Sequence, residues 1–133
     1  MSHLLNFEHV YRYDMDRVGI TVTVELRLLD LAVTFDAQVD TGASFCIFQR
    51  QYGEALGIDI ERGDRVVVGT ATGTFIVYGH MVTLSTVGLE FDSMVFFASH
   101  EGFRRNVLGR NGWLNKVRFG LIEYEGKLFL SQY

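Results

Sequence analysis

Val39-Asp40-Thr41-Gly42-Ala43-Ser44 is the most informative segment of the chain. It follows a run of alternating apolar residues and precedes a short helical pattern, which predicts a tight loop at the end of a strand. Gly42 allows the backbone to turn there, and the Thr41 hydroxyl can hydrogen-bond within the loop. A carboxylate on such a loop, here that of Asp40, suits acid and base chemistry on water. The segment also suits an ordinary strand-to-turn connection, so alone it is only a hypothesis.

The surrounding sequence predicts an all-β domain that spans residues 1–133. Every second residue is apolar in residues 20–28 and 31–39, which predicts two half-buried strands joined at Leu29-Asp30. Glycine-punctuated, β-branched and aromatic stretches predict the other strands, at residues 3–13, 65–68, 74–84, 89–98, 117–124 and 127–130. Residues 48–56 predict a short helix that stops at Gly57. Another short helix is expected near Leu114.

Composition narrows the functional classes. The chain has 133 residues, 48% of them apolar, which is enough for one domain with a buried core. Its net charge of −4 and its lack of a basic block argue against nucleic-acid binding. No apolar run is long enough to span a bilayer, and the first residues do not resemble a signal peptide, so we expect a cytoplasmic protein without a membrane partner. The single cysteine, Cys46, cannot form an internal disulfide, and we expect it to be buried rather than reactive.

Two further segments complete the pattern. Residues 69–73, Gly-Thr-Ala-Thr-Gly, form a tip of small residues between two predicted strands. That tip suits either an ordinary long hairpin or a mobile flap over a cleft. The segment Val107-Leu108-Gly109-Arg110-Asn111 follows later, where apolar residues and a glycine predict the end of a buried strand.

Together and in this order, the features of residues 20–114 resemble those of the retropepsin-like aspartic peptidases, the single-lobed family that includes retroviral proteases. The features are the Asp40 segment, the short helix, the glycine-tipped hairpin and the Leu-Gly-Arg-Asn segment at 108–111. The resemblance implies a closed acid-protease barrel and an aspartic endopeptidase that acts on peptides or proteins without a metal or other cofactor.

Such peptidases need two carboxylates that share one proton and hold the attacking water between them. This chain has a single Asp-Thr-Gly and is too short for a two-lobed enzyme. The resemblance therefore implies a homodimer in which Asp40 of each chain meets at the two-fold axis. The residues with an implied catalytic role are Asp40, Thr41 and Gly42, where Thr41 bonds across the dimer. Those with an implied substrate-binding role are Ala43, Ser44, Ala71, Thr72 and Gly73. Gly109 and Arg110 are the implied structural support beneath the loop.

The chain departs from the retroviral pattern at three places. Ser44 stands where retroviral members usually have an aspartate that pairs with the arginine at the place of Arg110. We expect Arg110 to use Asp36, Asp92 or a carbonyl instead, or to act as a packed anchor. The tip has Ala71 and Thr72 where retroviral flaps have glycine and a bulky apolar residue. The last hairpin, residues 117–133, is longer than in retroviral members, which leaves the mode of dimerisation open.

Two other functions are compatible with the residues. The altered tip and Ser44 also suit a catalytically silent dimer of this fold that binds peptides or proteins, in which Asp40 is a structural loop residue. Metal-dependent hydrolysis is the weaker possibility, because the four histidines lack the spacing of metal ligands. They are His3, His9, His80 and His100.

Overall fold

The computed structural model describes all 133 residues, and most of them lie in β-strands. The predicted hairpin before Asp40 is present as β2 (Thr21–Leu28) and β3 (Leu31–Val39). A second long hairpin consists of β6 (Gly73–Thr86) and β7 (Leu89–Ala98). The prediction of an all-β fold with short helices is confirmed.

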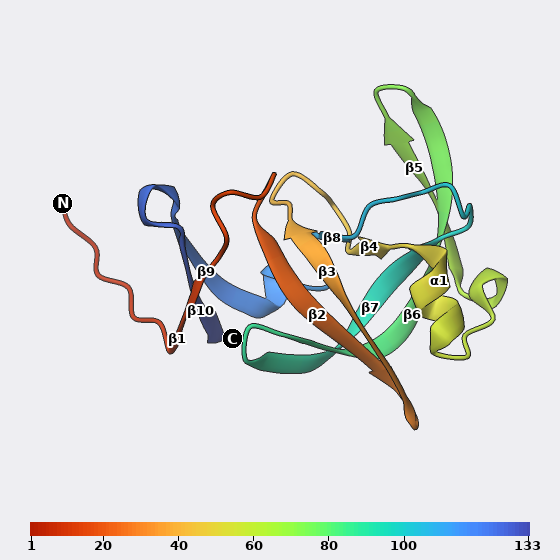
Figure 1. Cartoon of the computed structure of the whole chain (residues 1–133), viewed down its shortest axis with the longest axis horizontal. Helices are drawn as coiled ribbons and strands as arrows, with labels where there is room; N and C mark the ends of the chain where they lie inside the picture. Colours follow the sequence, from red (N-terminus) through yellow and green to blue (C-terminus); the bar gives the residue numbers. More distant parts are fainter.

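Six strands close on themselves. The main sheet has the order β2-β3-β8-β4-β7-β6-β5, in which β4 (Ile47–Phe48) and β8 (Val107–Leu108) are short and β5 (Asp64–Thr70) is the last strand. Strand β2 also pairs with β6, where Leu26 lies opposite Leu84. This pairing joins the two ends of a ring from β2 to β6. The distal parts of β5 and β6 project from that ring as a hairpin, drawn in green in Figure 1.

The interior of the ring is the hydrophobic core. Val22, Val24 and Leu26 alternate along β2 and are at most 1% exposed, because the period of a strand places them on one face. Phe48, Phe97 and Trp113 are the largest side chains that are fully buried. The alternation in the sequence therefore identified the inner face of β2 correctly.

A second, three-stranded sheet joins the two chain ends. Strands β1 (His9–Arg12), β10 (Lys127–Gln132) and β9 (Val117–Ile122) pair in that order, all antiparallel. Figure 1 places this sheet at the opposite end of the molecule from the projecting hairpin. Leu128 and Leu130 of β10 are fully buried in the main core, so the two sheets share this core.

The helices are short, and several boundaries differ from the prediction. The first strand spans only His9–Arg12 instead of residues 3–13, and β9 ends at Ile122 instead of residue 124. The helical elements are α1 (Arg50–Ala55) and the 3-10 turns η1 (Ile60–Arg62), η2 (Leu114–Lys116) and η3 (Glu123–Glu125). Helix α1 begins later than residue 48, because Phe48 belongs to β4 and Gln49 is extended. The tip of the projecting hairpin is narrower than residues 69–73, because Gly69 pairs with Thr74 and Thr70 with Gly73. None of these helices has the length and apolar character that a bilayer crossing requires.

Candidate active site

The Asp40 loop is held by its own backbone and by β8. The Asp40 N–H donates to the Leu108 carbonyl at 3.0 Å, and the Ala43 N–H donates to the Asp40 carbonyl at 3.1 Å. The Gly42 N–H donates to Asp40 Oδ1 at 2.9 Å. These bonds fix the orientation of the carboxylate at the end of β3, and Oδ1 already accepts one hydrogen bond. Oδ2 accepts no hydrogen bond from the chain and is the oxygen available for proton transfer.

Gly109 lies directly under this loop. A Cβ atom at position 109 would be 2.2 Å from the Phe45 carbonyl oxygen and 2.7 Å from that of Ala43. The next N–H group, that of Arg110, donates to the Ala43 carbonyl at 2.9 Å. Glycine at 109 is therefore what allows the two segments to approach closely enough for this bond.

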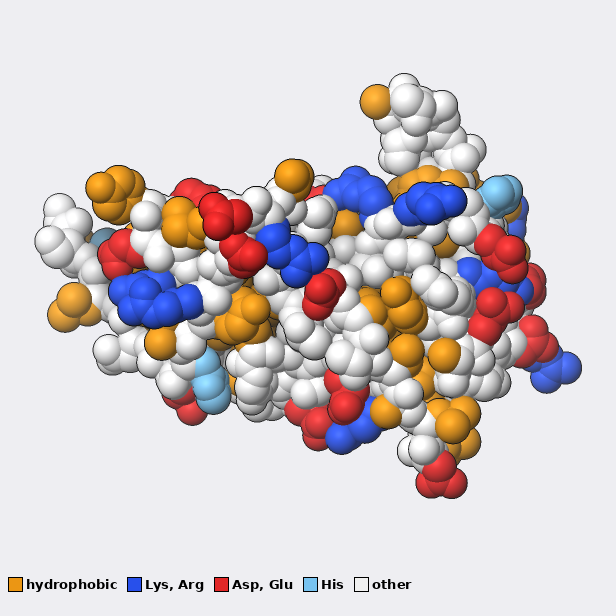
Figure 2. Space-filling view, in the orientation of Figure 1, with side chains coloured by type: hydrophobic (Ala, Val, Ile, Leu, Met, Phe, Trp, Pro, Cys, Tyr) orange, Lys and Arg blue, Asp and Glu red, His pale blue; other side chains and the backbone are white.

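The Asp40 loop and the projecting hairpin enclose a cavity of about 840 Å³. Figure 2 shows the hairpin standing clear of the body of the protein, with the hollow beside its base. Six of the residues predicted to act in catalysis or substrate binding line the cavity, namely Asp40, Gly42, Ala43, Ser44, Thr72 and Gly73. Thr41 and Ala71 do not line it. Both are exposed to solvent.

The tip of the hairpin is a two-residue turn, Ala71-Thr72. The Thr70 hydroxyl donates to the Gly73 carbonyl at 2.9 Å across this turn. Gly73 has a φ of +143°, a conformation that side chains disfavour, and a Cβ there would meet no other atom. The glycine at this position is thus explained by its backbone conformation and not by crowding.

The predicted side-chain partners of Arg110 are wrong. Asp36 forms an ion pair with Arg17, with 3.2 Å between Nη1 and Oδ2, and Asp92 accepts a hydrogen bond from Thr83. The Arg110 side chain is exposed and makes no hydrogen bond or ion pair within the chain. Its contribution to the loop is through the backbone, because Ser44 supplies no carboxylate that could hold the guanidinium.

Arg105 is a site residue that sequence reasoning missed. Its Nη2 atom lies 3.7 Å from Asp40 Oδ2, and its side chain lines the cavity. The sequence signal was the basic pair Arg104-Arg105, just before the Val107-Leu108-Gly109 segment. This pair lies 64 and 65 positions after Asp40 in the chain, so only the β3–β8 pairing brings Arg105 to the carboxylate.

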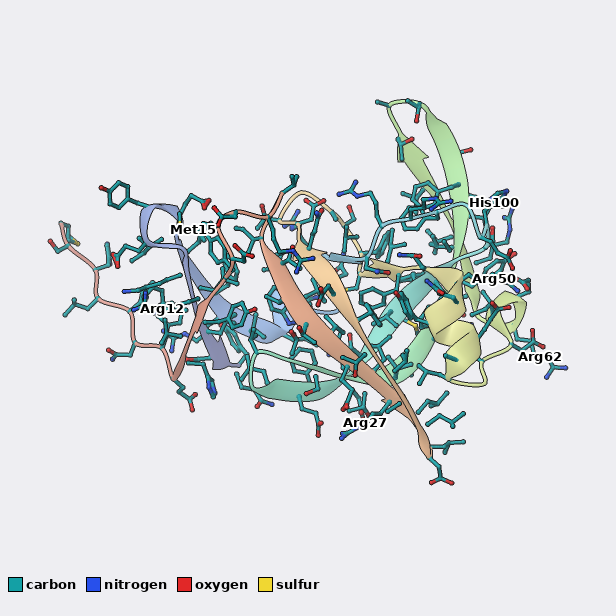
Figure 3. All side chains as sticks on the ribbon, viewed as in Figure 1. Arg12, Met15, Arg27, Arg50, Arg62 and His100 are labelled. Carbon is teal, nitrogen blue, oxygen red and sulfur yellow. The ribbon has the colours of Figure 1, made fainter.

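The other candidate residues have different surroundings. Cys46 is fully buried, and this burial raises the pKa of its thiol to about 12, so the thiol is not a nucleophile at neutral pH. His80 Nε2 is hydrogen-bonded to the Ile60 carbonyl at 2.8 Å. His100 lies at the base of the projecting hairpin in Figure 3 and lines the cavity, but it belongs to no group of three or more side chains that could hold a metal ion.

Comparisons with known proteins agree with this geometry. The sequence model of a family described as "Aspartyl protease" matches residues 22–112, a span that contains the Asp40 loop, the hairpin and Gly109. Two similar solved structures are a retropepsin-like aspartic protease from Rickettsia conorii and the EIAV protease complexed with the inhibitor HBY-793. The first has a TM-score of 0.63 at 17% identity and covers 92% of this chain and 96% of its own. The second has a TM-score of 0.57 at 17% identity, and the match covers 75% of this chain and 88% of the EIAV protease chain. A search of curated proteins gave no match.

Proposed function

Because this chain belongs to the aspartyl protease family and has a retropepsin-like fold, we propose that it hydrolyses peptide bonds at a site shared by two copies. The observation that carries the proposal is the Asp40 carboxylate, which is fixed by the Gly42 N–H at the floor of a cavity beneath a projecting hairpin. One chain supplies a single such carboxylate. A general acid and a general base therefore require a second copy.

In the proposed reaction, the two Asp40 carboxylates share one proton and hold a water molecule between them. The ionised carboxylate removes a proton from the water as its oxygen attacks the carbonyl carbon, and the protonated one donates to the carbonyl oxygen. The tetrahedral intermediate then collapses: one of its two hydroxyl groups returns a proton to the ionised carboxylate, the C–N bond breaks, and the leaving nitrogen takes the proton of the other carboxyl group. The pair returns to its starting state with one shared proton.

The surface of the Asp40 loop supports the dimer. Thr41, Gly42 and Ser44 are exposed in the single chain. The Thr41 hydroxyl makes no hydrogen bond within the chain, so it is available to a partner across a two-fold axis. An active-site loop with an exposed hydroxyl that has no partner within the chain suits an interface in which each loop covers the other.

The cavity suits an extended peptide. Its walls carry apolar side chains from both sides, namely Phe45, Ile47, Val68, Phe75, Phe103 and Val107. Residues 67–70 and 72–75 of the hairpin line the same cavity as the Asp40 loop. We expect a substrate strand to bind between them, with backbone hydrogen bonds for affinity and apolar pockets for side-chain preference.

The test is cleavage of a diverse peptide library from acid to neutral pH by wild type and Asp40→Asn. Asp36→Asn is the matched control, because Asp36 is an exposed aspartate on β3, the strand that leads to Asp40, and does not line the cavity. Wild type and Asp36→Asn are expected to cleave, and Asp40→Asn is expected to be inactive. Equal cleavage by Asp40→Asn would exclude the aspartic mechanism.

Mixing the two proteins tests the shared site. At constant total concentration, with subunits exchanging freely, a site that needs two intact Asp40 residues has activity proportional to the square of the wild-type fraction. An equal mixture then retains about one quarter of the activity, whereas independent monomers retain about one half. Activity proportional to the wild-type fraction itself, with one half retained in the equal mixture, would refute the dimeric site.

A second function rests on Ser44 and the Ala71-Thr72 tip, which differ from the retroviral pattern. A silent dimer would bind peptides in the same cavity without hydrolysis. Wild-type protein that is dimeric by sedimentation, binds labelled peptides and cleaves none at any pH would establish this alternative.

A further inference from the structure

Arg105 is held in place by its neighbours on the loop of residues 99–106. On one side, the Phe103 ring stacks on Phe75 of β6, with 5.1 Å between ring centroids. On the other side, Asn106 Oδ1 accepts from the Gln49 N–H at 2.9 Å, and the Asn106 carbonyl accepts from the Gln38 N–H at 2.9 Å. The Arg105 backbone is therefore fixed between two anchors, one of which belongs to the projecting hairpin.

The N–H donors of the Arg105 guanidinium have no acceptor within the chain. Its closest acidic atom is Asp40 Oδ2 at 3.7 Å, which is too far for a hydrogen bond. It makes no hydrogen bond to any other group of the chain, and its side chain is 63% exposed. A guanidinium carries five N–H donors in a planar fork that fits a carboxylate. The Arg105 guanidinium lines the cavity, and its N–H donors are free to bind a carboxylate there.

The charges in the cavity do not balance once the site is paired. Asp40 is the only carboxylate that lines the cavity, and Arg105 is the only arginine or lysine. Two Asp40 residues that share a proton carry one negative charge, whereas two Arg105 residues carry two positive charges. The paired site thus has an excess positive charge beside the reacting carboxylates.

An adjoining hollow of about 450 Å³ extends this positive surface. Arg105 lines both spaces and is joined in the second by Arg17 and Arg104. The one carboxylate there, Asp36, is already paired with Arg17. Figure 2 shows basic side chains on the face below the projecting hairpin. Of these three arginines only Arg105 also lines the cavity that contains Asp40, so an anionic side chain in that cavity meets Arg105 as its one cation.

We propose that Arg105 binds the carboxylate of a Glu or Asp side chain next to the scissile bond, and so makes the peptidase selective for acidic residues at that position. The inference rests on the proposed function. A scissile carbonyl must lie within hydrogen-bond reach of Asp40, and the guanidinium is 3.7 Å from that same carboxylate. The residue that flanks the scissile bond is consequently the one that Arg105 can reach.

The experiment compares two peptides that differ only by Glu or Gln beside the scissile bond, at pH 6, where the glutamate is ionised. Wild type is expected to prefer the Glu peptide by about tenfold in kcat/KM, the value of one charge-assisted hydrogen bond. Arg105→Gln is expected to cleave both peptides at similar rates. A third peptide carries Lys at the position of the Glu or Gln. Arg105→Glu is expected to cleave this Lys peptide faster than the Glu peptide. The wild-type preference is expected to fade below about pH 4, as the glutamate becomes protonated.

Arg104→Gln is the matched control, because Arg104 is adjacent in sequence, carries the same charge and does not line the cavity that contains Asp40. Arg104→Gln is expected to keep the tenfold Glu preference. Loss of the preference in Arg104→Gln and not in Arg105→Gln would overturn the assignment. Equal cleavage of the two peptides by wild type, with cleavage still dependent on Asp40, would overturn it while leaving the proposed function intact.

Binding gives a readout that does not need turnover. The two peptides, fluorescently labelled, are titrated into Asp40→Asn and into the Asp40→Asn, Arg105→Gln double variant. The Glu peptide is expected to bind Asp40→Asn more tightly than the Gln peptide, and the double variant is expected not to discriminate. If no peptide is cleaved by wild type, the proposed hydrolysis fails, but this titration still decides the role of Arg105. Equal affinities in Asp40→Asn would refute that role.

Discussion

Replacing Gly109 with Ala tests the packing that supports the active-site loop. The new methyl group would lie 2.2 Å from the Phe45 carbonyl oxygen, whereas ordinary contacts begin at 3.4 Å, so the two backbone segments must separate by about 1 Å. That movement weakens two hydrogen bonds, from the Arg110 N–H to Ala43 and from the Asn111 N–H to Ser44, each 2.9 Å long. At about 1 kcal/mol per bond and about 2 kcal/mol for overpacking, the loss is about 4 kcal/mol.

Thermal unfolding of Gly109→Ala at fixed protein concentration measures this loss. We expect Tm to fall by about 15 °C, since each kcal/mol corresponds to about 4 °C in a domain of this size. Gly69→Ala is the matched control, because a Cβ at Gly69 meets no atom within 4 Å and the backbone there needs no left-handed conformation. Wild-type Tm in Gly109→Ala, or an equal loss in both variants, would refute the steric argument.

Three other predictions test separate regions. Hydrogen bonds from Arg50 lower the pKa of Glu61, so Glu61 stabilises the fold above its ordinary pKa and loses this effect as pH falls through the lowered value. Glu61→Gln should therefore lower the urea midpoint at pH 7, with a difference that shrinks at pH 3. Because burial raises the pKa of the Cys46 thiol to about 12, this thiol should react with a disulfide reagent at pH 8 only after urea unfolds the protein. Amides of residues 69–74 should exchange with deuterium faster than those of residues 79–86, since the former project into solvent and the latter pair with β7.

The sequence was most predictive where one face of a strand is buried. The alternation in residues 20–28 and 31–39 located β2 and β3 almost to the residue, because a slip of one position would expose Val24 and Leu26. The order of Asp40, the hairpin tip and Gly109 predicted the family, and the backbone requires the glycines at positions 73 and 109. The prediction of a retropepsin-like fold is accordingly confirmed.

The sequence was least predictive where a contact depends on distant elements. Nothing local distinguishes Arg105 from Arg104, and only the anchoring of residues 99–106 decides that Arg105, and not Arg104, lines the cavity that contains Asp40. The predicted side-chain partners of Arg110 were wrong because they are engaged elsewhere. Its motif implied a side-chain partner, but Asp36 and Asp92 are engaged by Arg17 and Thr83. The same motif therefore predicted the backbone role of Gly109 correctly and the side-chain partner of Arg110 incorrectly.

The arrangement of the chain ends constrains how two copies can meet. Strand β10 is the centre of the three-stranded sheet and is paired on both sides within its own chain, by β1 and by β9. Leu128 and Leu130 are buried in the same chain's core, so β10 cannot leave this sheet to pair with a partner strand without taking them out of that core. The only strand edges that this sheet offers a partner are those of β1 and β9. We therefore expect the exposed Asp40 loop to supply much of the dimer contact. In the proposed dimer, mutations at Thr41 would affect association and catalysis together, because the proposal assigns both to the Asp40 loop.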